Sequence, residues 1–378
     1  MDHWQKELRN SIHTADQLED YINLTPEERR GIERIEGTFN WGISPYYASL
    51  MDPDDPDCPI RRQVVPRIEE LHDRLGVWDP LREEDHSPVE NLIHVYPDRV
   101  AFCVSSLCAT FCRFCLRKRM VDNRGCPIGR DNLEEGLDYI RRTEGIRDVL
   151  LTGGDPLLMP DEQIEEIVAR VHEIPHVELV RIGSRAPCTL PMRITDELCE
   201  RLARHQPFWI NTHFEHPKEL TPEAVAACGR LVDHGIPMGN QSVLLKGVND
   251  DAEVLKELGE RLVAARVRPY YLYQCQVLKG TAHFRVQIER GLELVRTLRG
   301  HTTGFAIPQY VLDTPYGKVP LNYQYIRERE DDHVVMETFS GKLWREPNPV
   351  EERQSSPAGV VPTCASMHGC GTPHCERD

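Results

Sequence analysis

The chain has no long apolar run, no leader-like N-terminus and no internal repeat. It therefore offers no segment of about 18 apolar residues, the length that a membrane-spanning helix needs. Its first residues, Met1-Asp2-His3-Trp4-Gln5-Lys6, lack the charged-then-apolar order of a secretory signal peptide. We expect a cytoplasmic protein that has no membrane partner.

An excess of positive charge is also missing. The 45 Lys and Arg residues stand against 61 Asp and Glu residues, which gives a formal net charge of −16. This balance disfavours nucleic acid and anionic membranes as partners, although local basic pockets can still bind anions. The 378 residues, 40% of them hydrophobic, are enough for one large domain with extensions.

Cysteine is not scarce, since the chain has 13. In a reducing compartment, clusters, metals or plain burial explain cysteines better than disulfides do. Cys108, Cys112 and Cys115 follow a short apolar run with the spacing Cys-x3-Cys-x2-Cys. Three thiolates on one loop can ligate three irons of a 4Fe–4S cluster and leave the fourth iron open to a small molecule. A zinc loop is the alternative, but structural zinc usually takes four ligands in two close pairs.

The segment before the cysteines is strand-like, and such a strand followed by this spacing resembles the radical S-adenosylmethionine (SAM) superfamily. In that superfamily SAM binds the open iron, and one electron cleaves its sulfonium.

Residues 1–95 are rich in charge and proline and predict a helical N-terminal extension, with helical patterning over Trp4–Ile22 and a helix start at Thr25-Pro26. From Val100 onward, β-rich runs alternate with helix-patterned segments, which is typical of βα units around a parallel sheet. The expected strands are Val100–Ser106, Asp148–Thr152, Glu178–Ile182, Phe208–Thr212, Pro237–Leu244, Arg268–Tyr273 and Gly304–Leu312. The expected helices are Leu133–Thr143, Glu162–His172, Asp196–Arg204, Pro222–His234, Ala252–Ala265 and Val286–Arg299. This alternation predicts an α/β fold with a partial or complete barrel, whose reactive groups lie at the C-terminal ends of the strands.

Two loops at expected strand ends carry groups suited to chemistry. Gly153-Gly154-Asp155 follows the second strand, where paired glycines let the backbone approach a ligand, although alone they also fit a simple turn. Lys318 follows the last strand in a glycine-containing loop and is placed to form the Schiff base that pyridoxal phosphate (PLP) requires. Most lysines, however, are only solvated surface charges.

The C-terminal tail is rich in glycine and proline and has little apolar material to fold around. It contains Cys364, Cys370 and Cys375. Zinc ligation by these cysteines would order the tail, and a disordered tail is the alternative.

Taken together, the motifs resemble lysine 2,3-aminomutase and its close relatives, SAM-radical enzymes that also use PLP. The resemblance covers nearly the whole chain and rests on the cysteine loop and on residues 21–28, 44–47, 96–100, 148–155, 174–177, 181–185, 211–214, 239–245 and 268–271. It implies a partial (β/α)6 radical-SAM barrel over residues 96–315 after the helical extension. A C-terminal segment, residues 316–378, would carry the PLP lysine loop and help to assemble a homo-oligomer, a dimer or tetramer.

The resemblance also implies roles for individual residues. Lys318 matches the PLP lysine, Arg99 would hold the PLP phosphate, and Arg117 would hold the α-carboxylate of the substrate. The remaining positions matched to SAM, PLP and the cluster are Gly153, Gly154, Asp155, His213, Gln241 and Tyr273, with Cys108, Cys112 and Cys115 as cluster ligands.

Two positions depart from the lysine enzymes. Where those enzymes hold the distal ammonium of the substrate with two aspartates, this chain has Asp313 and Gln276. An ammonium that faces one carboxylate instead of two loses about 1–3 kcal/mol. Asp251 stands where the lysine enzymes offer a cysteine to an intersubunit zinc, which weakens the case for zinc.

The sequence therefore predicts an isomerase that moves the amino group of a free amino acid from the α to the β carbon, with L-lysine first. Arginine, glutamine, glutamate or a neutral amino acid are alternative substrates. A protein-bound lysine and a non-catalytic metal-binding role are further alternatives. A flavodoxin or ferredoxin is the expected one-electron donor.

Overall fold

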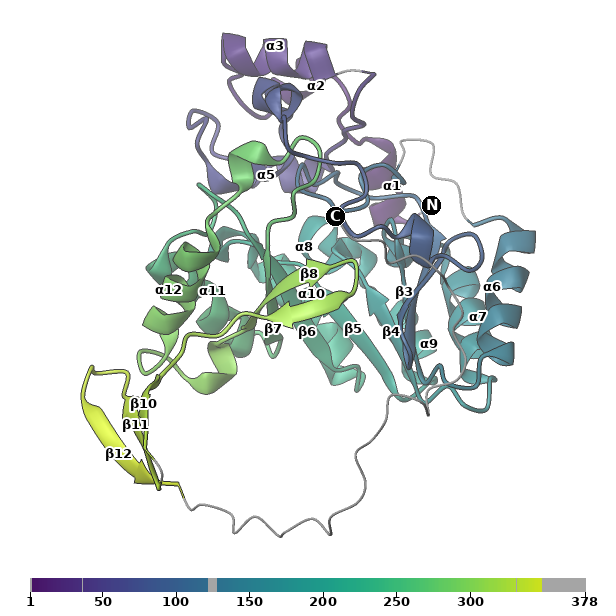
Figure 1. Ribbon diagram of the computed structural model, residues 1–378. Helices are drawn as coiled ribbons and strands as arrows, with labels where there is room; N and C mark the ends of the chain where they lie inside the picture. Colours follow the sequence, from purple (N-terminus) through teal and green to yellow (C-terminus); the bar gives the residue numbers. More distant parts are fainter. Residues whose placement is uncertain (1, 36, 122–127, 331, 349–378) are drawn as a thin grey trace, which may run out of the picture. The chain divides into compact units, whose positions relative to one another are not determined.

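The computed structural model describes residues 2–35, 37–121, 128–330 and 332–348 (Figure 1). Residues up to Tyr323 form one compact unit, and residues from Gln324 onward form a second. The predicted domain limits at residues 95 and 315 both lie inside the first unit, and they stay a prediction.

A curved sheet organises the first unit, where nine strands of the described residues are joined in the order β1 to β9. Strands β2 to β8 are parallel to their neighbours, whereas β1 and β9 pair antiparallel at the two edges. The strands are β1 (Leu92–Tyr96), β2 (Arg99–Ser105), β3 (Asp148–Gly153), β4 (Leu179–Gly183), β5 (Phe208–Thr212), β6 (Met238–Leu244), β7 (Arg268–Gln274), β8 (Gln309–Thr314) and β9 (Gly317–Pro320). The predicted α/β fold with a partial (β/α)6 barrel is confirmed.

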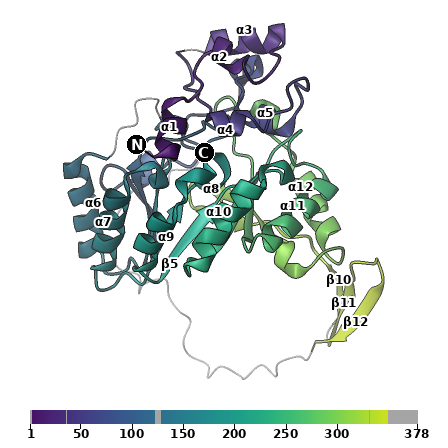
Figure 2. The same ribbon diagram turned by 180° about the vertical axis from the view of Figure 1, so that it is seen from behind.

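Helices connect the parallel strands and cover the outer face of the sheet (Figure 2). They are α6 (Arg130–Arg142), α7 (Asp161–His172), α8 (Ala186–Thr189), α9 (Asp196–Ala203), α10 (Pro222–Asp233), α11 (Ala252–Ala264) and α12 (Ile288–Leu298). Short 3-10 helices lie between them at Pro156–Leu158, Pro191–Arg193, Pro217–Glu219, Ala282–Phe284 and Gly304–Ala306. In α7, Ile164, Ile167, Val168 and Val171 are buried at the spacing of one helix face, which explains how the helix packs on the sheet.

The two faces of the strands do different work. Successive side chains of a strand point to opposite faces. Val149 and Leu151 of β3 are fully buried under the helices, whereas Leu150 between them is only half-buried and faces the inside of the curved sheet. Arg181 of β4 faces the same inner side. Burial of one large aliphatic side chain contributes about 1.5–3 kcal/mol, so the outward-facing residues supply most of the stability of the sheet.

Two elements predicted from the sequence are wrong. The helical pattern over Trp4–Ile22 is split into α1 (His3–Arg9) and α2 (Ala15–Leu18), because Ile12 between them pairs with Ile43 in an isolated β-bridge. The strand predicted over Gly304–Leu312 begins only at Gln309, after a 3-10 turn and Pro308, which has no N–H to donate.

The N-terminal extension is helical, as predicted, and belongs to the first unit. After α1 and α2 it contains α3 (Pro26–Ile35), α4 (Pro45–Ala48), α5 (Pro59–Val64) and 3-10 helices at Ile68–His72 and Glu84–His86. Thr25 precedes α3, and its hydroxyl accepts the Glu28 N–H at 3.1 Å, while the Glu28 carboxylate accepts the Thr25 N–H at 3.0 Å. This capping box confirms the predicted helix start. The Glu28 carboxylate also pairs with Arg61, whose Nε lies 2.8 Å from Glu28 Oε1.

Replacing Glu28 by glutamine is expected to lower the free energy of unfolding by about 3–5 kcal/mol at pH 7, because it leaves the buried Arg61 guanidinium without its counter-charge. Burial alone would raise the pKa of Glu28, but Arg61 and the Thr25 N–H lower it below the usual 4.5. The unfolded chain then binds a proton more readily, so this stabilisation is present above about pH 4.5 and is lost as the pH falls through the folded pKa.

Urea unfolding at pH 7 and pH 4 measures both effects. Glu28→Gln should be less stable at pH 7 and should lose less stability on acidification than the unmodified chain. Glu27→Gln, at an exposed position of the same helix, is the matched control. Equal stability of the two variants at pH 7 would disprove the role of the buried pair.

In the second unit, β10 (Ile326–Arg329), β11 (His333–Glu337) and β12 (Leu343–Pro347) form an antiparallel sheet. The predicted zinc ligands Cys364, Cys370 and Cys375 lie outside the described residues. Within the described ranges, no helix combines the length and the apolarity that crossing a bilayer would take.

Candidate active site

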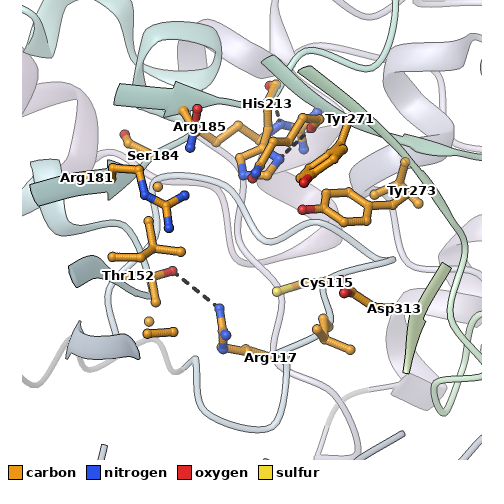
Figure 3. Close-up of a pocket in the computed structure, with 18 of the residues that line it drawn as sticks. Cys115, Arg117, Thr152, Arg181, Ser184, Arg185, His213, Tyr271, Tyr273 and Asp313 are labelled. Atoms are coloured by element: carbon orange, nitrogen blue, oxygen red, sulfur yellow. Dashed lines mark hydrogen bonds between the residues drawn. The ribbon is translucent and has the colours of Figure 1, made fainter. Parts of the chain in front are cut away.

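A cavity of about 790 Å³ lies inside the curved sheet, and residues from every strand between β1 and β9 contribute to its wall. Figure 3 shows Cys115, Arg117 and Asp313 beside this space, together with Arg185, His213 and Tyr273. All sequence-predicted site residues of the described part line this one cavity: Arg99, Cys108, Cys112, Cys115, Arg117, Gly153, Gly154, Asp155, His213, Gln241, Tyr273, Gln276, Asp313 and Lys318.

The three cysteines of the loop face the cavity together. Burial is the main cause that raises the pKa of the Cys112 thiol to about 11, with Arg185 opposing and the Cys115 thiol adding to the shift. Burial and then the nearby Cys115 thiol also raise the pKa of Cys108. Three converging soft sulfur ligands that resist ionisation on their own fit a cationic iron–sulfur group, because a bound metal favours the thiolate form.

The N-terminal extension holds this loop in place. Arg113, which follows Cys112, is buried, and its Nε and Nη2 donate to the Glu70 carboxylate at 2.9 and 2.7 Å. The Arg113 N–H donates to the Gln63 carbonyl oxygen, and the Phe111 N–H donates to that of Gly42, both at 2.8 Å. The path of the cysteine loop therefore depends on residues more than 40 positions away in the sequence.

The Gly153-Gly154-Asp155 motif joins the end of β3 to the cysteine loop. Gly153 has φ +115°, and a Cβ there would lie 2.3 Å from the Ser105 carbonyl oxygen; one at Gly154 would lie 2.5 Å from that of Leu107. Asp155 Oδ1 accepts the Leu157 N–H at 3.1 Å, and Oδ2 accepts the Arg185 N–H at 2.8 Å. Close contact between these segments requires both glycines, and the contact predicted with SAM stays a prediction.

His213 is a neutral side chain at the end of β5. Its Nδ1 lies 2.7 Å from the Gln241 carbonyl oxygen, and since a carbonyl only accepts, Nδ1 carries the proton. Burial, and then the Arg185 charge, lower the pKa of His213 to about 4. At neutral pH, Nε2 is therefore an unprotonated acceptor.

Arg185 is a site residue that sequence reasoning did not single out. Its Nη1 donates to Cys112 Sγ at 2.6 Å, and its Nη2 pairs with Glu219 Oε1 at 2.8 Å. The guanidinium is buried, and Glu219 compensates its charge. The only sequence signal was its place directly after a strand, which it shared with several other polar residues.

Lys318 lies near the open seam of the sheet, between the edge strands β1 and β9. Its Nζ is 3.0 Å from Asp313 Oδ1 and 5.6 Å from the centre of the Tyr273 ring. The Lys318 N–H donates to the Tyr96 hydroxyl of β1 at 2.6 Å, which links the two edges. A backbone bond to Tyr96 and an ion pair with Asp313 thus fix the lysine inside the cavity.

The two predicted side-chain contacts of the substrate lie beside this lysine. Gln276 Nε2 donates to the Asp313 backbone carbonyl at 3.0 Å, so the amide is tied to β8. Arg99 lies on the same wall, with its guanidinium 3.7 Å from the centre of the Tyr96 ring and 2.9 Å from Asp98 Oδ1. The structure gives Asp251 a local role, since its carboxylate accepts the Glu253 and Val254 N–H groups and caps α11.

Comparisons with known proteins agree with this geometry. A model of the Radical SAM superfamily matches residues 102–258, and a model named Lysine-2,3-aminomutase matches residues 295–366. The L-lysine 2,3-aminomutase of Clostridium subterminale is 45% identical over 371 residues, 97% of this chain and 89% of the relative. The L-lysine 2,3-aminomutase of Methanococcus maripaludis is 45% identical over 89% of this chain and 79% of the relative. The glutamate 2,3-aminomutase of Clostridioides difficile is 43% identical over 90% of this chain and 81% of the relative. The chain belongs to the lysine 2,3-aminomutase family of the radical SAM superfamily.

Proposed function

We propose that this protein is a radical SAM, PLP-dependent isomerase that moves the amino group of free L-lysine from the α to the β carbon. The observation that carries the proposal is that the cysteine cluster and Lys318 line the same cavity. The identity to L-lysine 2,3-aminomutases over most of the chain supports the same reaction.

The donor sets fit the groups that this family uses. Cys108, Cys112 and Cys115 would hold a 4Fe–4S cluster with SAM on its open iron, and Lys318 would hold PLP. When bound, the cluster and SAM supply a carbon-centred radical, and PLP stabilises an unpaired electron beside the migrating nitrogen.

The residues of the chain bind, orient and exclude water around these groups. Arg117 would bind the α-carboxylate, because a planar guanidinium matches a carboxylate, and its Nε is buried with no hydrogen-bond partner in the described residues. Arg99 would bind the PLP phosphate. Gly153, Gly154, Asp155, His213, Gln241 and Tyr273 would line the SAM and PLP sites. The curved sheet keeps these groups away from bulk water, which limits side reactions of a reactive radical.

The distal pocket favours a second substrate candidate. Asp313 is the carboxylate available to a substrate ammonium, and its present partner is Lys318. Gln276 supplies an amide beside it, which suits a neutral or amide side chain better than two carboxylates would. Glutamine, arginine, glutamate or a neutral amino acid would then undergo the same reaction.

We also propose a cytoplasmic homo-oligomer, a dimer or tetramer, that receives its electron from a flavodoxin or ferredoxin. Zinc ligation by Cys364, Cys370 and Cys375 remains part of this proposal only as a prediction from the sequence.

An anaerobic assay of the reconstituted protein with SAM, PLP and dithionite tests the proposal. A panel of amino acids is supplied, and β-amino acid formation is followed by NMR. We expect turnover of lysine above all other substrates. Conversion of another amino acid would keep the reaction and change the substrate, and no conversion by protein that holds cluster and PLP would disprove the proposal.

A further inference from the structure

A turn of the N-terminal extension, residues 79–84, reaches the cavity wall through Leu81 and Glu83. The Glu83 side chain is only 6% exposed and lies between two arginines of the cysteine loop. Its Oε1 accepts Arg117 Nη2 at 2.8 Å, and its Oε2 accepts Arg119 Nη2 at 3.1 Å. One carboxylate thus bridges two guanidinium groups.

The backbone that delivers Glu83 is strained. Arg82, the preceding residue, has φ +52°, a left-handed conformation that costs a non-glycine residue free energy. Such strain persists only where the surrounding contacts impose it. Here the contacts are those of Glu83 with the two arginines and of Arg82 Nε with Asp85, at 2.6 Å.

Arg117 is held at two of its three nitrogens. Nη2 is bound by Glu83, and Nη1 donates to Thr152 Oγ1 at 3.3 Å (Figure 3). The remaining donor, Nε, is buried and has no partner among the residues that the structure describes. A guanidinium fixed in this way presents one unsatisfied donor in a set direction, although the arginine side chain is long and flexible.

Glu83 also keeps the charge of this corner balanced. Arg117 and Arg119 bring two positive charges, and Glu83 and Asp79 bring two negative ones, with Asp79 Oδ1 3.2 Å from Arg119 Nη2. Without Glu83, Arg117 would lose its only ion-pair partner in the described part of the chain.

We propose that Glu83 is a positioning residue that sets the Arg117 guanidinium to receive the α-carboxylate of the amino-acid substrate. This inference rests on the proposed function, which assigns the carboxylate to Arg117. Glu83 does not touch the substrate; it acts through Arg117.

Glu83→Gln tests the inference, because it keeps the shape of the side chain and removes its charge. Glu84→Gln is the matched control, since Glu84 is 83% exposed and lies 3.9 Å from Arg119. The protein, carrying its cluster and PLP, is titrated without reductant, so that no turnover occurs. Calorimetry gives the dissociation constants of lysine and of 1,5-diaminopentane, which lacks the carboxylate.

Glu83→Gln is expected to weaken lysine binding about tenfold and to leave diamine binding unchanged, whereas Glu84→Gln changes neither. In an Arg117→Gln background, Glu83→Gln should add no further loss, because both changes remove one interaction. Glu83→Asp, which keeps the charge, should recover part of the affinity and serves if Glu83→Gln fails to fold.

Unchanged lysine binding in folded Glu83→Gln would overturn the inference, and so would an equal loss for lysine and the diamine. If Arg117→Gln itself binds lysine as tightly as the unmodified protein, the assignment of the carboxylate to Arg117 falls, and the role of Glu83 falls with it. Normal loss in Arg117→Gln without any loss in Glu83→Gln would remove only the role of Glu83.

Discussion

Replacing Lys318 by alanine is expected to lower product formation about a thousandfold or more, because no other group can supply the Schiff-base amine at this position. The change also leaves Asp313 without its ion-pair partner at 3.0 Å. The cysteine loop is built from other residues, so the cluster should assemble normally in this variant.

Three measurements separate these effects. Product is followed by NMR, cluster content by iron analysis and electron paramagnetic resonance, and PLP attachment by borohydride reduction and peptide mass spectrometry. Lys246→Ala, at an exposed position, is the matched control and should keep full turnover. Undiminished turnover of Lys318→Ala would refute the PLP assignment, and loss of the cluster would show instead that the variant is misfolded.

Gln276→Asp is expected to raise kcat/KM for lysine roughly tenfold or more relative to glutamine. It places a second carboxylate beside Asp313, and a hydrogen bond to a charged group contributes about 1.5–3 kcal/mol, which corresponds to roughly 10–150-fold. The gain should appear mainly in KM, because the contact is made to the side chain of the substrate and not at the reacting carbons.

Competition between lysine and glutamine in one reaction gives this ratio directly. Gln276→Asn keeps an amide and is the control that should not shift it. An unchanged ratio in Gln276→Asp would mean that residue 276 does not contact the distal group of the substrate. This result would leave the fold and the reaction unaffected.

The sequence predicted the parallel strands and the cavity residues well, for a physical reason. A residue directly after a β run lies at the carboxyl edge of the sheet wherever the strands are parallel. His213 after β5, Gln276 after β7 and Asp155 after β3 therefore come together whatever the lengths of the intervening helices. Cys108, Cys112 and Cys115 are close because they share one loop.

What the sequence did not predict depends on long-range contacts. Strands β1 and β9 are short edge strands whose pairing is set by their neighbours. Glu83 stands in a charged, proline-containing stretch where no pattern separates it from Glu84, and only the fold brings it to Arg117. The turn before β8 was also missed, since its apolar residues resemble a strand until Pro308 is considered.

The alternation of faces along the strands has an evolutionary consequence. Val149, Leu151 and Val180 pack under the helices, while Leu150 and Arg181, their immediate neighbours in the chain, face the cavity. Mutation of an inward residue can change substrate preference without opening a hole in the packed layer, so selection for a new substrate and selection for folding act on different residues of the same strand. A barrel open on its inner side can therefore diversify its chemistry at little cost in robustness.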